Sequence, residues 1–199
     1  PGRRRNKSAP TFPEVSFLNR INQKIDEFCY RHPNFGIPNL MKIIVIGTAV
    51  VYALYLLTGY NASAVSFLSF NLASVLHGEV WRLGTFIFMP SDTNPFWLGI
   101  SLFFYYFVGT TLEREWGTAK FNLFYFGGAV LSLIAVILAT LITGQNLTLS
   151  STNYINMSMF FAFAMLYPEA TVLLLVIPVK IKYLAWLGGA LFALNILAA

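Results

Sequence analysis

The chain has 199 residues, of which 57% are hydrophobic and only 11% are charged. A soluble domain carries about 25% charged residues, so the composition excludes a soluble globular protein and predicts a polytopic, all-α membrane helical bundle. The net charge of +5 does not indicate a nucleic-acid partner, because most cations precede the first apolar segment. There they predict a cytoplasmic N-terminus that attracts anionic lipids of the bilayer.

The N-terminal region divides into two predicted parts. Residues 1–13 are basic and contain prolines, which predicts a disordered tail. In residues 14–38, apolar side chains recur at intervals of three and four between charged ones. This pattern predicts an amphipathic helix that is too polar to cross a membrane and lies in the cytoplasmic interface. Cys29, the only cysteine, excludes an internal disulfide and is expected to pack in this segment, with palmitoylation as the alternative.

Residues 39–199 are expected to form the membrane domain, with at least five transmembrane spans and a sixth beyond the chain end. Residues 62–76 are moderately apolar and are expected to be half-buried at the outer interface. Residues 81–95 hold prolines and polar side chains that cannot cross lipid unsatisfied, so they are expected to lie in the outer leaflet. A charged turn is expected over 112–120, and residues 171–178 form a short apolar run. The predicted spans are 41–59, 96–111, 121–143, 154–167 and 183–197.

Two motifs stand at fixed positions in this apolar background. One is the pair Trp81-Arg82, and the other is the pattern of Gly109, Glu113 and Gly117 at the end of the second span. Together they resemble the rhomboid superfamily of intramembrane serine proteases and their inactive relatives. The resemblance implies a rhomboid-like bundle with a re-entrant loop after the first span, anchored by Trp81, Arg82, Glu113 and Gly117. An ordinary solvated helix end is the alternative for Glu113.

The side chain of Arg82 has a specific expected environment. A guanidinium group held near hydrocarbon needs its donors satisfied. We therefore expect Arg82 to bond backbone carbonyls of its own loop or the carboxylate of Glu113.

The same resemblance locates the positions that carry catalysis in active rhomboids. The nucleophile position falls on Asn153, at the start of the fourth span, where active members have a serine between glycines. Ser158 and Ser150 are the weak candidates for a replacement nucleophile, and neither is flanked by glycine. The side-chain oxyanion donors of the second span fall on Trp97 and Ser101, which do not match the histidine and asparagine of the family pattern.

The general base is also missing from its expected place. The two histidines, His32 and His77, precede the first span and the loop, respectively, instead of lying on a late span. The sequence therefore favours a derlin-like pseudoprotease that binds transmembrane segments of other membrane proteins. The alternative is an active intramembrane serine endopeptidase with a histidine beyond residue 199.

Other classes of function find less support in the sequence. A transporter or channel is disfavoured because no charged residue lies inside the spans, away from their ends. No cofactor motif or metal-ligand cluster is present, so neither is expected. The expected location is a bacterial plasma membrane, and the oligomeric state is not indicated.

Overall fold

The computed structural model describes residues 23–32, 35–61, 63–169, 171–174, 177–181, 183, 186 and 188–190. This part of the chain is mostly helical, which confirms a helical membrane protein. It contains three helices that are long and apolar enough to cross a membrane: α2 (Leu40–Leu57), α6 (Pro95–Trp116) and α7 (Thr118–Thr143). The predicted tail 1–13, the start of the segment 14–38 and most of the predicted span 183–197 lie outside the described residues.

The fourth predicted span is a helix shorter than the others. Helix α8 (Asn153–Leu166) is apolar but has only 14 residues. At about 1.5 Å per residue it reaches about 21 Å, whereas a hydrocarbon core is about 30 Å thick. Five full spans and a re-entrant loop therefore remain predictions.

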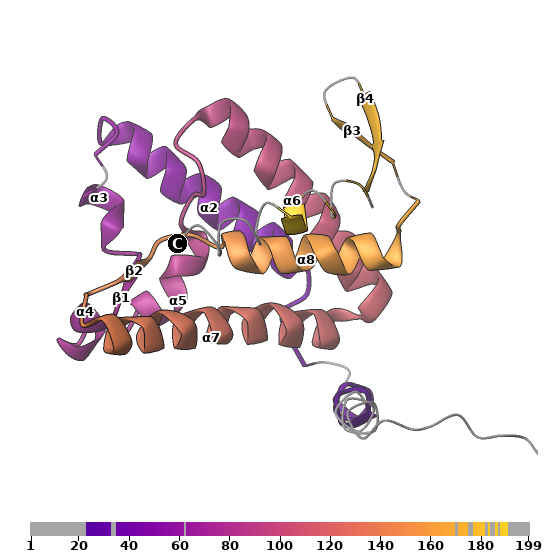
Figure 1. Cartoon of the computed structure of the whole chain (residues 1–199), viewed down its shortest axis with the longest axis horizontal. Coiled ribbons are helices and arrows are strands. Elements are labelled where there is room, and N and C mark those ends of the chain that lie inside the picture. The colour runs from indigo at the N-terminus through magenta and orange to yellow at the C-terminus, as the bar shows by residue number, and fades with distance from the viewer. Residues whose placement is uncertain are drawn as a thin grey trace, which may run out of the picture.

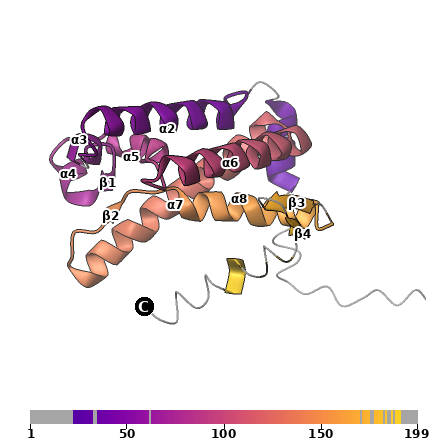
Figure 2. The ribbon, with the colours of Figure 1, turned by 90° about the horizontal axis from the view of Figure 1, so that it is seen from above.

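The helices form a bundle in which α6 lies between α2 and α8, and α7 packs against both α6 and α8 (Figure 2). We call the end of the bundle where α2 begins and α6 ends the inner end, and the opposite end the outer end. Large side chains from each helix fill the space between them. The fully buried ones include Met41, Val108, Leu112, Phe121, Tyr125 and Met159.

The segment between α2 and α6 folds into short pieces at the outer end (Figure 1). A two-residue strand in it, β1, pairs antiparallel with β2 (Thr148–Leu149) from the loop before α8. This pairing joins the segment between α2 and α6 to the loop before α8. The segment is therefore held by a contact in its middle as well as by the two helices at its ends. The pieces are α3 (Ser63–Ser66), β1 (Phe70–Asn71), α4 (Leu72–Leu76), α5 (Arg82–Thr85) and the 3-10 helix η1 (Phe86–Phe88).

The inner end of α6 differs from the sequence expectation. The predicted charged turn over 112–120 is wrong, because α6 continues through Trp116 and Gly117 alone separates it from α7. Gly117 has a φ of 82° and a ψ of 156°, in the region that glycine adopts far more readily than other residues. The turn is therefore a sharp corner of one residue.

A β-hairpin follows α8 where the sequence suggested only a short apolar run. Strands β3 (Thr171–Leu174) and β4 (Ile177–Lys180) pair antiparallel (Figure 1). The segment is rich in β-branched residues, which favour strands. The expectation of an all-α protein is thus wrong in detail, since two small two-stranded sheets accompany the helices.

Candidate functional site

The position that resembles a catalytic nucleophile lies at the start of α8. Asn153 is the first residue of that helix, and its side chain is exposed. Five residues further along, the hydroxyl of Ser158 donates a hydrogen bond to the carbonyl oxygen of Ile155, at 2.7 Å. Ser150 lies in the loop before α8 and is exposed. In the described part of the chain, no hydrogen bond joins Ser158 or Ser150 to a histidine or a carboxylate, the groups that activate a serine nucleophile.

The two positions that the family pattern gives to the oxyanion donors are Trp97 and Ser101. Trp97 lies in the first turn of α6 and is 52% exposed. The hydroxyl of Ser101 donates to the carbonyl of Leu98, 2.9 Å away in the same helix.

The histidine rings contact their own helices. Nδ1 of His77 lies 2.7 Å from the carbonyl oxygen of Ala73, and Nδ1 of His32 lies 3.3 Å from that of Phe28. The structure therefore does not bring the histidines to either candidate serine.

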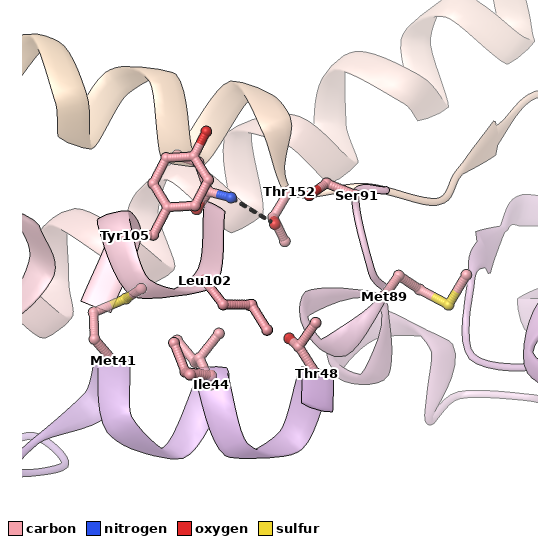
Figure 3. A pocket seen from close by; sticks show the side chains of 10 residues that line it. Met41, Ile44, Thr48, Met89, Ser91, Leu102, Tyr105 and Thr152 are labelled. Carbon is pink, nitrogen blue, oxygen red and sulfur yellow. Dashed lines mark hydrogen bonds between the residues drawn. The ribbon is translucent and has the colours of Figure 1, made fainter. Parts of the chain in front are cut away.

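A small cavity lies between α2, α6, α8 and the loop before α6 (Figure 3). Five polar side chains line it: Thr48 from α2, Ser91 from the loop before α6, Tyr105 from α6, Thr152 just before α8, and Asn156 from α8. Thr48, Thr152 and Asn156 are 5%, 6% and 7% exposed, respectively, whereas Ser91 and Tyr105 are half-buried. Nδ2 of Asn156 donates to Oγ1 of Thr152 at 3.0 Å. Sequence reasoning missed this group, although an asparagine inside an apolar helix is itself a signal, because keeping it there costs free energy.

Arg82 makes the central contacts of the outer loop. One guanidinium nitrogen, Nη1, donates to the carbonyl oxygens of Ser66 and Ser69, each at 2.8 Å, and Nε donates to the carboxylate of Glu79. The sequence predicted bonds either to carbonyls of residues 81–95 or to Glu113, and neither is present among the described residues. The bonded carbonyls belong to the end of α3 and the turn after it, which precede residues 81–95.

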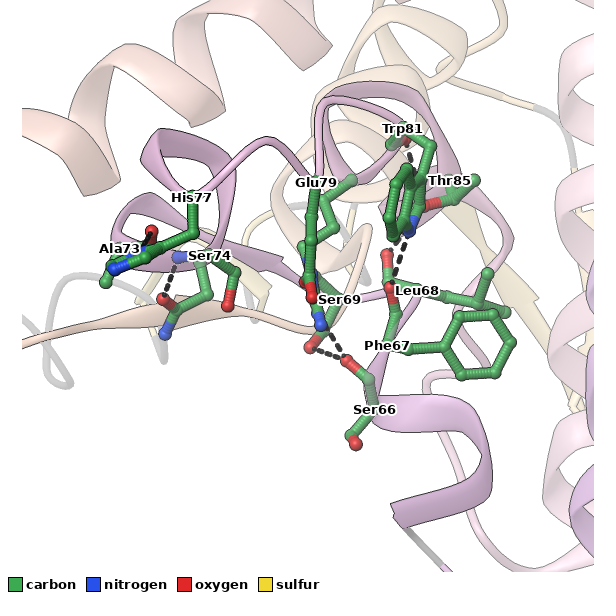
Figure 4. Close-up of polar contacts among 12 residues, drawn as sticks. Ser66, Phe67, Leu68, Ser69, Ala73, Ser74, His77, Glu79, Trp81 and Thr85 are labelled. Carbon is green, nitrogen blue, oxygen red and sulfur yellow. Dashed lines mark hydrogen bonds and ion pairs between the residues drawn. The ribbon is translucent and has the colours of Figure 1, made fainter.

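Two further side chains bond to the same turn (Figure 4). The indole nitrogen of Trp81 donates to the carbonyl of Phe67 at 3.3 Å, and the hydroxyl of Thr85 donates to that of Leu68 at 3.0 Å. Together with Arg82, these donors satisfy the four consecutive carbonyls of residues 66–69. We call this arrangement the carbonyl clamp. Thr85 was not singled out from the sequence, although it stands four residues after Trp81 and so one helical turn along.

Gly109 and Glu113 of α6 hold neighbouring segments at the inner end of the bundle. A side chain at Gly109 would place its Cβ 2.0 Å from Cγ of Met41, so the glycine permits the close approach of α2. The carboxylate of Glu113 accepts hydrogen bonds from the backbone nitrogen of Asn39, at 2.9 Å, and from the hydroxyl of Thr118, at 3.1 Å. It thereby ties the residue before α2 to the first residue of α7.

Comparison with protein families identifies this membrane domain. A family model described as eukaryotic integral membrane protein (DUF1751) matches residues 42–198, which include α2, α6, α7 and α8. The chain belongs to this family. The expected location in a bacterial plasma membrane is therefore wrong, because the DUF1751 family is eukaryotic. No curated protein and no solved structure matches the chain.

A further residue of the DUF1751 domain, Asn122, was missed from the sequence. It is 2% exposed near the start of α7. Its carboxamide accepts from the nitrogen of Ile37 at 2.9 Å, and donates to the carbonyls of Ile37 at 3.0 Å and Thr118 at 2.8 Å. Asn122 thus holds the backbone that precedes α2, as Glu113 does two residues further along that segment.

Proposed function

We propose that this DUF1751 protein is a non-catalytic, rhomboid-like membrane protein that binds transmembrane segments of other membrane proteins. The proposal is carried by the start of α8: Asn153 is the first residue of that helix, and the resemblance to rhomboids gives its position to the nucleophile. A carboxamide is not the activated nucleophile that acyl transfer needs. The hydroxyl of Ser158 points back to its own helix at the carbonyl of Ile155. Binding without cleavage fits such a site better than hydrolysis.

The unequal lengths of the helices support binding of a guest helix. At about 1.5 Å per residue, α8 reaches about 21 Å, whereas α6 reaches about 33 Å and α7 about 39 Å. A bilayer that contacts helices of different length must deform, at a cost of a fraction of a kcal/mol for each Å of mismatch. A transmembrane segment that covers α8 removes part of this lipid contact. The proposal therefore places the guest beside α8.

Site-specific crosslinking tests where a guest binds. The full chain is reconstituted with a defined single-span peptide, and a photoreactive residue replaces Met165 of α8 or Leu131 of α7. These side chains are 80% and 67% exposed, so both report on the surface of the bundle. Crosslinking from position 165 is expected to exceed crosslinking from position 131 by several fold. Equal crosslinking at the two positions would contradict a binding surface beside α8.

Hydrolysis is tested separately with the full chain, a fluorogenic transmembrane substrate and a fluorophosphonate probe. We expect neither cleavage nor labelling. Labelling that disappears together with cleavage in Ser158→Ala or Ser150→Ala would establish the alternative, an intramembrane serine endopeptidase.

We also propose that the segment 14–38 lies on anionic lipid at the cytoplasmic face. In its described part, residues 23–31 form a helix, and Nζ of Lys120 contacts the carboxylate of Asp26 at 2.8 Å. This ion pair joins the helix to the first turn of α7. Tyr30 is 89% exposed and available to the interface. Beyond the signal of the four native tryptophans, Tyr30→Trp should add fluorescence that brominated lipid quenches. Added fluorescence that stays unquenched would contradict the proposal.

A further inference from the structure

We infer that the cavity between α2, α6 and α8 is a binding site for one water molecule, which bridges Thr48 on α2 to Thr152 and Asn156 beside and on α8. The inference goes beyond the proposed binding of transmembrane segments, because it concerns how the bundle itself is held together. It does not depend on whether a guest helix is bound.

The polar groups of the cavity have unused hydrogen-bonding capacity. Thr48, Thr152 and Asn156 are all more than nine-tenths buried. Among them, the only hydrogen bond runs from Nδ2 of Asn156 to Oγ1 of Thr152. Within the described part of the chain, the hydroxyl of Thr48 and Oδ1 of Asn156 have no protein partner. Neither oxygen is completely covered by protein atoms, so water can reach both, and polar groups inside a protein are nearly always satisfied by protein or by ordered water.

The arrangement of these groups suits a bridging molecule. Figure 3 shows the hydroxyls of Thr48 and Thr152 facing the same space from opposite sides. Water can donate and accept at once, so it can bond both hydroxyls and the free amide oxygen of Asn156. Buried waters make about three such bonds on average, with a range of about two to four.

The size of the cavity is suited to a single water molecule. The space open to the centre of a water-sized sphere is about 20 Å³. A single water needs about 10–15 Å³ by this measure, so the cavity has room for one water. Cavities that stay empty are lined by apolar groups alone. Here Met41, Ile44 and Leu102 cover one part of the wall, while the hydroxyls and the carboxamide cover another.

Radiolytic footprinting provides a direct test, because an X-ray pulse converts bound water to hydroxyl radicals that oxidise methionines beside it. Met41 lines the cavity and is only 1% exposed. Met159 is 0% exposed and does not line it, which makes it the matched control. In the intact chain in nanodiscs, sulfoxide at Met41 is expected to form several times faster than at Met159. Equal protection of the two methionines would overturn the inference.

Substitution of the bridging groups makes the test specific. Thr48→Val keeps the shape of the side chain but removes its hydroxyl, and it should lower oxidation of Met41 to the level of Met159. Thr111→Val is the control, because the hydroxyl of Thr111 bonds to the carbonyl of Phe107 in its own helix, away from the cavity. Should Thr48→Val fail to fold, Thr152→Val serves the same purpose from the other side. Oxidation of Met41 that persists in a folded variant of either kind would refute the bridging water.

Discussion

Replacing Arg82 with alanine is expected to lower the free energy of unfolding by about 2 kcal/mol. Most of this comes from the carbonyl of Ser69, a residue only 7% exposed, which loses the donor at 2.8 Å. A buried acceptor left without its partner costs about 1–3 kcal/mol. Loss of the bond to the carbonyl of Ser66 costs less free energy, because the amide and the hydroxyl of Ser69 still donate to that carbonyl. The carboxylate of Glu79 is 38% exposed, so loss of that ion pair adds about 0–1 kcal/mol.

The assay is reversible unfolding of the full chain in bicelles, followed at the same lipid composition for each variant. Arg114→Ala is the matched control, because Arg114 is exposed at the inner end of α6 and has no hydrogen bond or ion pair within the described residues. Its loss should change stability by less than about 0.5 kcal/mol. Arg82→Lys should fall between the two, since an ammonium group cannot reproduce the planar fork of the guanidinium. If Arg82→Ala is no more destabilising than Arg114→Ala, the carbonyl clamp does not hold the outer loop.

Two further predictions use the same unfolding assay. Gly109→Ala should destabilise by about 1–3 kcal/mol, because its Cβ would lie 2.0 Å from Cγ of Met41, whereas Gly99→Ala, with nothing within 4 Å, should be neutral or slightly stabilising. Similar effects at the two glycines would contradict close packing of α2 on α6. The hydrogen bond from Tyr167 to Glu115 raises the pKa of Tyr167 above its usual 10.0. The stability it adds should therefore be complete below about pH 10 and be lost as the pH rises through the raised pKa. The difference between the wild-type chain and Tyr167→Phe should close only in that alkaline range, and a difference that persists at higher pH would disprove the coupling.

The hydrophobic runs predicted α2, α6 and α7 because length and apolar composition are local properties of the sequence. The end of α6 was placed too early for a local reason as well. Charged residues such as Glu113 and Arg114 suggest a turn, but a helix that leaves the hydrocarbon continues into the interface with charged side chains. What stops it is Gly117, whose backbone conformation the composition does not reveal.

The partners of the polar side chains could not be predicted in the same way. Arg82 bonds to carbonyls 13 and 16 residues earlier, and Asn122 bonds to a residue 85 positions away. These contacts depend on how α3 and the segment before α2 fold back on the bundle. The sequence marked Arg82 and Glu113 as residues that need partners, because each carries a charge near hydrocarbon. It could not show that Glu113 bonds to the backbone before α2, or that Arg82 bonds to carbonyls of the outer loop.

The one-residue corner at Gly117 has a consequence for how the protein is made. The chain leaves α6 and enters α7 with no loop between them, so α7 begins two residues after Trp116. A ribosome-bound insertion channel can therefore not release α6 into lipid and later start α7 from a separate aqueous loop. We expect the two helices to enter the bilayer together as a preformed hairpin. The corner would then be decisive during synthesis as well as in the finished fold, and a long flexible insertion there should allow each helix to be inserted alone.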